Sequence, residues 1–127
     1  MTATKAFVNI QGEPLATVMY QPDKWKSDVV LIHGFTGSKE DFTDVAGHLV
    51  LKDYRVLTFD NRGQHESGYS KRSDGYSMES LGRDAIELSR YFDLKKPHLL
   101  GHSFGGLIAQ QAVAQQPSNE KHRLCYL

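Results

Sequence analysis

The sequence feature that most constrains the fold is a short apolar segment that runs directly into a G-x-S-x-G pentapeptide at residues 101–105. When a strand turns abruptly into a helix, a serine at the turn exposes its hydroxyl at the sheet edge, beside the N–H of the next residue. Gly101 and Gly105 suit this turn because strand and helix approach too closely there for a side chain. The pattern therefore predicts a strand, an elbow at Ser103 and a helix, and it makes Ser103 a candidate nucleophile.

Strand and helix patterns alternate along the rest of the chain. Strand patterns cover residues 6–10, 15–20, 28–32, 55–59, 98–100 and 122–127, and helix patterns start at Ser38, Ser77 and Phe104. The first two strands are joined by a turn cluster that contains glycine and proline, which predicts an antiparallel hairpin. The later alternation predicts an α/β fold, with a mostly parallel sheet and helices on both faces.

Apolar periodicity also predicts which face of each helix is buried. The inward positions share a spacing of three or four residues: Phe42, Val45, Ala46 and Leu49 in the first helix, Met78, Leu81, Ala85, Leu88 and Phe92 in the second, and Phe104, Leu107, Ile108 and Ala112 in the third. Glutamines 110, 111 and 115 are expected to face outward. We interpret these apolar stripes as core and not as a cofactor site.

Composition narrows the class of protein. The length of 127 residues suits one domain spanning residues 1–127. Fifteen basic and fifteen acidic residues cancel and form no block, which argues against nucleic-acid or anionic-membrane partners. No run is long enough to span a membrane, and no signal-peptide pattern follows Met1. A single cysteine, Cys125, excludes an internal disulfide and suits a reducing compartment, so we expect a cytoplasmic protein.

Three segments should meet where ligands bind in such sheets, at the carboxyl ends of the strands. They are residues 33–38, residues 60–67 and the elbow at Ser103. We expect His33 to organise its loop by hydrogen bonding and not to act as a base, and we interpret His102 as pocket lining or packing. The alternative for Ser103 is a glycine-flanked helix cap without chemistry. No spacing of His, Cys and carboxylates indicates a metal site, and no phosphate-binding or dinucleotide motif is present, so no metal or cofactor is expected.

Three motifs in this order resemble those of the α/β-hydrolase family. They are His33-Gly34-Phe35 after one strand, Asp60-Asn61-Arg62-Gly63 after the next, and the segment from Gly101 to Gly106 after the third. The resemblance runs through essentially the whole sequence and corresponds to the N-terminal half of the family's fold. It implies Ser103 as nucleophile, the backbone N–H groups of Phe35 and Phe104 as the oxyanion hole, and Gly34, Gly105 and Gly106 as residues that shape the site. It also implies an acyl hydrolase acting on a small-molecule carbonyl compound of the carboxylic ester type.

The partners of Ser103 are harder to find in the sequence. In this family the acid and the histidine follow the serine, and downstream of Ser103 only Glu120 and His122 are available. A helix over residues 104–116 would carry the chain about 20 Å, to the opposite edge of the sheet, which places His122 at the wrong end. We therefore expect a truncated α/β-hydrolase core with an incomplete triad and negligible turnover. The alternatives are a non-catalytic interaction or binding fragment, or a lyase or C–C bond hydrolase on the same fold.

Two further features set expectations. The apolar segment at residues 124–127 predicts an uncovered edge strand and self-association through it. After Gly63, related sequences usually read His-Gly-x-Ser, whereas this chain has Gln64-His65-Glu66-Ser67. A histidine where glycine is usual strains the loop or reshapes the pocket, and His65 is also a weak candidate for a substitute base.

Overall fold

The described part of the chain forms six strands and four helical segments. The strands are β1 (Thr2–Ile10), β2 (Glu13–Gln21), β3 (Ser27–Ile32), β4 (Tyr54–Phe59), β5 (His98–Gly101) and β6 (Arg123–Tyr126), and the helices are the 3₁₀ helix η1 (Lys39–Phe42), α1 (Thr43–Leu51), α2 (Met78–Tyr91) and α3 (Phe104–Gln115). The structure is a computed structural model that describes residues 1–116 and 123–126. Glu120 and His122 lie outside the described residues.

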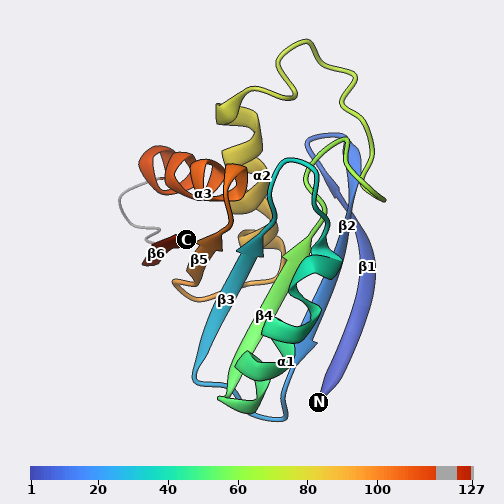
Figure 1. Ribbon diagram of the computed structural model, residues 1–127. Coiled ribbons are helices and arrows are strands. Elements are labelled where there is room, and N and C mark those ends of the chain that lie inside the picture. The colour runs from blue at the N-terminus through green and yellow to red at the C-terminus, as the bar shows by residue number, and fades with distance from the viewer. Residues whose placement is uncertain (117–122, 127) are drawn as a thin grey trace.

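One mixed sheet contains all six strands, in the order β1-β2-β4-β3-β5-β6 (Figure 1). The β1–β2 and β2–β4 pairs are antiparallel, and β4, β3, β5 and β6 run parallel to one another. The chain leaves β3 for β4 on one side and later returns to β5 on the other, so the strand order reverses at β3. Such a reversal opens a crevice at the carboxyl ends of the strands, which is where ligands bind in open α/β sheets.

The N-terminal hairpin is confirmed, and it is longer than predicted. Gln11 and Gly12 form its turn with φ values of 52° and 94°, as expected when two residues with positive φ connect twisted antiparallel strands. Pro14, expected in the turn, instead lies in β2 opposite Asn9. Proline is tolerated near the start of a strand, where the N–H that it lacks is not needed for the ladder.

Helices cover both faces of the sheet (Figure 1), and each face carries its own hydrophobic core. Helix α1 covers one face, where Phe42, Ala46 and Val50 pack against apolar residues of β3 and β4. Helices α2 and α3 cover the other, where their buried residues join those of β1 to β5 in one larger cluster. The predicted α/β fold with helices on both faces is therefore confirmed.

Two predicted helix faces are wrong in part. Val45, which the periodicity predicts to be buried, is 43% exposed. The side chains that are buried against this face of the sheet are those of Phe42, Ala46 and Val50. The first turn there is a 3₁₀ helix, whose tighter winding rotates the residues that follow. Leu107 in α3 is 53% exposed, whereas the residues that this helix buries are Gly105, Gly106, Ile108, Ala109 and Ala112.

Helix α2 begins as predicted. The Ser77 hydroxyl accepts a hydrogen bond from the Ser80 N–H at 3.1 Å and caps the helix.

No helix within the described residues is both long and apolar enough to cross a membrane.

Candidate active site

Ser103 occupies the turn between β5 and α3, at the carboxyl edge of the sheet. Its φ is 56° and its ψ is −119°, a backbone conformation that is uncommon for a residue with a side chain. The residue is exposed. Strained backbone of this kind concentrates at functional sites, where the surrounding structure holds it in place.

The glycines on either side allow this turn because backbone atoms fill the space where their side chains would be. A Cβ on Gly101 would lie 2.2 Å from the carbonyl oxygen of Gly105. A Cβ on Gly105 would lie 2.1 Å from the carbonyl oxygen of Ile32, at the end of β3. The start of α3 therefore packs directly on the main chain of β3 and β5.

The loop after β3 lies beside the elbow. A Cβ on Gly34 would be 3.6 Å from the Ser103 Cβ and 3.5 Å from the His102 Nδ1. The neighbouring Phe35 ring packs edge to face against Phe104, with the ring centroids 6.0 Å apart. The structure thus brings Gly34, Phe35, Ser103 and Phe104 together, as the sequence predicts.

His33 is fully buried and holds this loop through both ring nitrogens. Its Nε2 accepts a hydrogen bond from the Asn61 N–H at 2.9 Å, so its proton resides on Nδ1. That Nδ1 lies 2.6 Å from the Gly34 carbonyl oxygen, which also accepts the Gly37 N–H at 3.0 Å. The Gly34 carbonyl and the Phe35 N–H belong to one peptide plane, so these bonds restrain the Phe35 N–H from the Gly34 side.

His102 takes a different position. Its backbone N–H donates to the Ile32 carbonyl at 3.0 Å, which ties the elbow to β3. Its side chain is exposed, and its role in lining the site stays a prediction.

The family of the chain follows from comparison with known proteins. A family model described as alpha/beta hydrolase fold matches residues 29–121, which include all three loops of the site. The chain belongs to the alpha/beta hydrolase fold family.

Two relatives illustrate the family's range. The chain is 31% identical over 117 residues to an uncharacterized hydrolase, YraK, of Bacillus subtilis, and 34% identical over 119 residues to the proline iminopeptidase PfmaB of Pestalotiopsis fici. These matches cover 92% and 91% of this chain but only 42% and 41% of the relatives. The chain therefore spans about two fifths of the length of these alpha/beta hydrolases.

Solved structures of alpha/beta hydrolases share the fold. Epoxide hydrolase A from Mycobacterium thermoresistibile superimposes with a TM-score of 0.85 at 23% identity, over 98% of this chain and 39% of that one. An esterase from Exiguobacterium antarcticum gives 0.82 at 22% identity, over 98% of this chain and 44% of that one. At this level of identity the comparison establishes the architecture alone.

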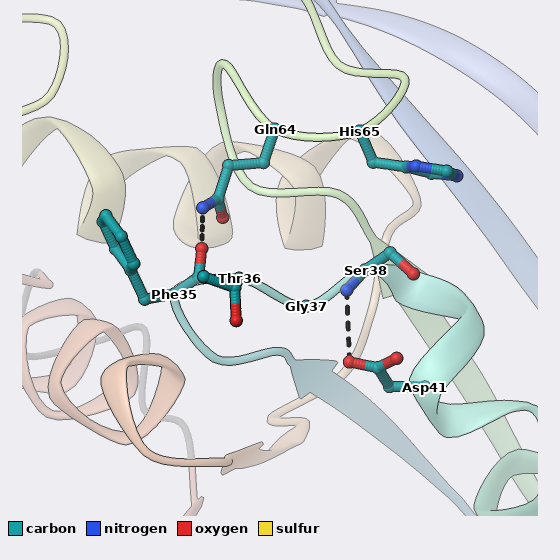
Figure 2. A pocket seen from close by; sticks show the side chains of 7 residues that line it. All are labelled: Phe35, Thr36, Gly37, Ser38, Asp41, Gln64 and His65. Atoms are coloured by element: carbon teal, nitrogen blue, oxygen red, sulfur yellow. Dashed lines mark hydrogen bonds between the residues drawn. The ribbon is translucent and has the colours of Figure 1, made fainter.

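A pocket of about 390 Å³ lies between two loops of this member of the family (Figure 2). Its lining comes from the loop and helical turn after β3 and from the loop after β4: Phe35, Thr36, Gly37, Ser38, Asp41, Gln64 and His65. His65 has a φ of 47° in the position where related sequences carry glycine, as the sequence suggests. Its Nε2 lies 3.3 Å from the Glu40 carboxylate, and within the described residues it has no hydrogen bond to Ser103.

A charged cluster beside the pocket was missed by the sequence analysis. Ligand atoms of Glu40, Asp60, His65 and Glu66 lie within 4.8 Å of one another. The Lys39 ammonium already sits among them, 2.8 Å from Asp60 and 2.7 Å from Glu66. Burial lowers the pKa of Lys39, but its hydrogen bonds to Asp60 and Glu66 outweigh that effect and leave the pKa raised. Because the Lys39 ammonium already pairs with these carboxylates, we assign the cluster to an ion-pair network.

A second buried network anchors the loop after β4. Arg62 is almost wholly buried and binds both carboxylate oxygens of Asp84 in α2, at 2.7 and 3.0 Å. It also lies 3.3 Å from Glu13 and donates to the Ile10 carbonyl, both in the hairpin. Burial raises the pKa of Asp84, and the Arg62 guanidinium acts in the opposite direction. The network ties the loop to one helix and two strands.

Proposed function

We propose that Ser103 is the nucleophile of a hydrolase that cleaves small carbonyl compounds of the carboxylic ester type. The observation that carries the proposal is the strained, exposed Ser103 beside a loop in which the Phe35 N–H is restrained. Within the described residues, neither the Phe35 nor the Phe104 N–H donates to a backbone carbonyl in a turn, loop or cap, which leaves both for a ligand. Two donors beside an exposed serine hydroxyl are what an acyl transfer needs.

The proposed reaction proceeds in two halves. The Ser103 Oγ adds to the substrate carbonyl carbon while its proton passes to a general base, and the bond to the leaving alcohol then breaks as that alcohol takes up the proton. Water repeats the addition on the acyl-enzyme, releasing the carboxylic acid and restoring Ser103. The Phe35 and Phe104 N–H groups donate to the oxygen that becomes negative, and one such donor contributes about 3–4 kcal/mol to lowering the barrier. The N-terminal end of α3 adds a favourable field.

We expect the general base that activates Ser103 to lie outside the described residues. His33 uses both ring nitrogens in contacts with Asn61 and Gly34, so it offers no acceptor to Ser103. We place the base and its acid partner in the portion of the family's fold that follows the matched part of the relatives. On this basis the 127 residues alone turn over substrate negligibly.

A second candidate reaction uses the same site. Similarity to the proline iminopeptidase of P. fici favours cleavage of a peptide bond next to an N-terminal proline, in which the acyl carbon is that of proline. The exposed Phe35 side chain, which packs against Phe104 next to Ser103, offers apolar surface for either type of acyl group.

We also propose self-association at the C-terminal edge of the sheet. Strand β6 pairs with β5, and no other described strand pairs with it. An open strand edge is a template for pairing with a second chain. Light scattering over a concentration series should show a rising mass, and a constant monomer mass would contradict this.

A fluorophosphonate probe tests the proposed chemistry. We expect labelling at Ser103 in a longer chain that continues past residue 127 as the relatives do, and much weaker labelling of the 127 residues alone. Ser103→Ala should abolish the label, whereas Ser73→Ala, at an exposed serine in the loop after β4, should leave it unchanged. No labelling of either chain would refute the proposal and favour a binding fragment. Strong esterase activity of the 127-residue chain, lost in Ser103→Ala, would contradict the incomplete triad.

A further inference from the structure

The Gln64 side chain reaches from the loop after β4 to the loop after β3. Its Nε2 donates a hydrogen bond to the Phe35 carbonyl oxygen, and Figure 2 shows the amide pointing across the gap between the two loops. Phe35 is the residue whose N–H we propose as a donor of the oxyanion hole, and its ring packs against Phe104, next to Ser103. The contact therefore joins the unusual Gln64-His65 sequence to the loop after β3, residues 33–38, which we call the oxyanion loop.

The main chain of Gln64 is held at both ends. Its N–H donates to the Asn61 carbonyl at 2.9 Å, and its carbonyl accepts the Ser67 N–H at 3.0 Å. The second bond closes a turn in which His65 takes its positive φ. A side chain that extends from so fixed a turn can hold the group it touches in a defined place.

The direction of the Gln64 amide is set by the Phe35 carbonyl. Within the described residues, the Gln64 Oε1 is the buried side-chain polar atom without a hydrogen-bond partner. Exchanging the amide oxygen and nitrogen would face the Phe35 carbonyl oxygen with a second oxygen, which is repulsive. The amide nitrogen is thus the group that the Phe35 carbonyl requires, even though Oε1 is left unpaired.

We propose that Gln64 is a positioning residue that clamps the oxyanion loop by holding the Phe35 carbonyl. The inference rests on the proposed function, because it assigns a purpose to the Phe35 N–H. His33 and Gly37 fix the peptide plane before Phe35 through the Gly34 carbonyl, and Gln64 fixes the plane after it. With both neighbouring planes held, the Phe35 N–H stays aimed at the developing oxyanion without reorganisation during the reaction.

Nuclear magnetic resonance of the labelled 127-residue chain tests the clamp without requiring turnover. Gln64→Leu removes the donor and keeps most of the side-chain volume. We expect the Phe35 carbonyl ¹³C signal and the Thr36 amide signal to move, because these two groups share the peptide that Gln64 binds. We also expect the order parameter of the Phe35 N–H to fall from about 0.85 to below about 0.6.

Gln64→Glu gives a reversible version of the same test. At neutral pH the introduced carboxylate cannot donate, so the Phe35 signals should resemble those of Gln64→Leu. Below its pKa, ordinarily about 4.3, the carboxyl group gains a donor and the signals should return toward those of the wild type. Gln110→Glu, at an exposed position of α3, should leave the Phe35 signals unchanged at every pH. If Gln64→Leu fails to fold, the titration of Gln64→Glu decides the question.

The outcomes separate the clamp from the nucleophile. Unchanged Phe35 signals and mobility in both Gln64 variants would overturn the clamp, even if fluorophosphonate labels Ser103. In the longer chain, Gln64→Leu should slow the covalent step of labelling at least tenfold without weakening the initial binding of the probe. An unchanged covalent step would overturn the positioning role. Absence of labelling in the wild-type longer chain would overturn the proposed function, and the positioning role with it.

Discussion

Replacing Gly105 by alanine tests whether the close packing of the elbow sustains the fold. An added Cβ would lie 2.1 Å from the Ile32 carbonyl oxygen and 2.6 Å from the His33 carbonyl oxygen, where real contacts stay beyond about 3 Å. Both neighbours are backbone atoms at the end of β3, and Ile32 is fully buried. Neither can move aside as a flexible side chain would, so α3 must shift away from the sheet.

The expected magnitude follows from two opposing effects. Alanine in place of glycine inside a helix contributes about 1 kcal/mol of stability. Overpacking against rigid backbone costs more than the usual 1–3 kcal/mol of an enlarged core side chain, so we expect Gly105→Ala to destabilise the chain by about 3 kcal/mol net. Gly47 in α1 is the matched control, because a Cβ there would have no neighbour within 4 Å. Gly47→Ala should therefore stabilise the chain by about 0.5–1 kcal/mol.

Urea unfolding followed by tryptophan fluorescence measures both variants. Trp25 is the single tryptophan and lies against the Arg55 guanidinium, 4.5 Å from ring centroid to carbon, so its emission reports on the folded strand region. The midpoint should fall for Gly105→Ala and rise for Gly47→Ala at a similar slope. A midpoint for Gly105→Ala within error of the wild type would refute the reasoning that the elbow excludes a side chain.

Three further predictions concern the loop after β4. Lys39→Met leaves the buried Asp60 carboxylate with only its two backbone N–H donors. We expect this variant to lower the free energy of unfolding, measured by urea titration, by about 3 kcal/mol. A loss below about 1 kcal/mol would contradict this expectation. The Lys39 hydrogen bond lowers the pKa of Glu66 below its ordinary 4.5, so this contribution is present above pH 4.5 and is lost as the pH falls through the folded-state pKa. Glu66→Gln should therefore flatten the acid side of the stability profile, and an equally steep profile would count against the pair. His65→Gly relieves the positive φ and should raise the unfolding midpoint by the equivalent of about 0.5–1 kcal/mol, whereas a lower midpoint would show that the Glu40 contact matters more.

The parts of the fold that could be predicted from the sequence depend on local patterns. The apolar strand at Ser27–Ile32, the capped helix from Ser77 and the glycine-flanked elbow each carry their signal within a few consecutive residues. The faces of α1 and α3 were harder, because periodicity alone does not reveal a 3₁₀ first turn or a preference for glycine against the sheet. Leu107 is exposed, although its spacing from Phe104 suggests a core position.

The interactions that join the loops after β3 and β4 are distant in the sequence. The Lys39 ammonium meets Asp60 and Glu66 across 21 and 27 residues, and His33 meets Asn61 across 28. No composition or spacing rule pairs residues at such separations. The one sequence signal was the departure at Gln64 and His65, which marked the loop as unusual without indicating what it contacts.

These long-range contacts hold the loops after β3 and β4 in a fixed position relative to each other. Three separate bonds, from Lys39 to Asp60, from the Asn61 N–H to His33 and from Gln64 to Phe35, link the loops after β3 and β4. The proposed oxyanion loop is therefore held by contacts within the described residues. Preorganised donors contribute to catalysis because they need not reorient as charge develops. We therefore expect that a carbonyl-mimicking boronic acid, titrated while the Phe35 and Phe104 amide signals are monitored, shifts both signals in the wild-type chain and neither in Ser103→Ala. A shift that survives Ser103→Ala would place the ligand elsewhere than at the serine.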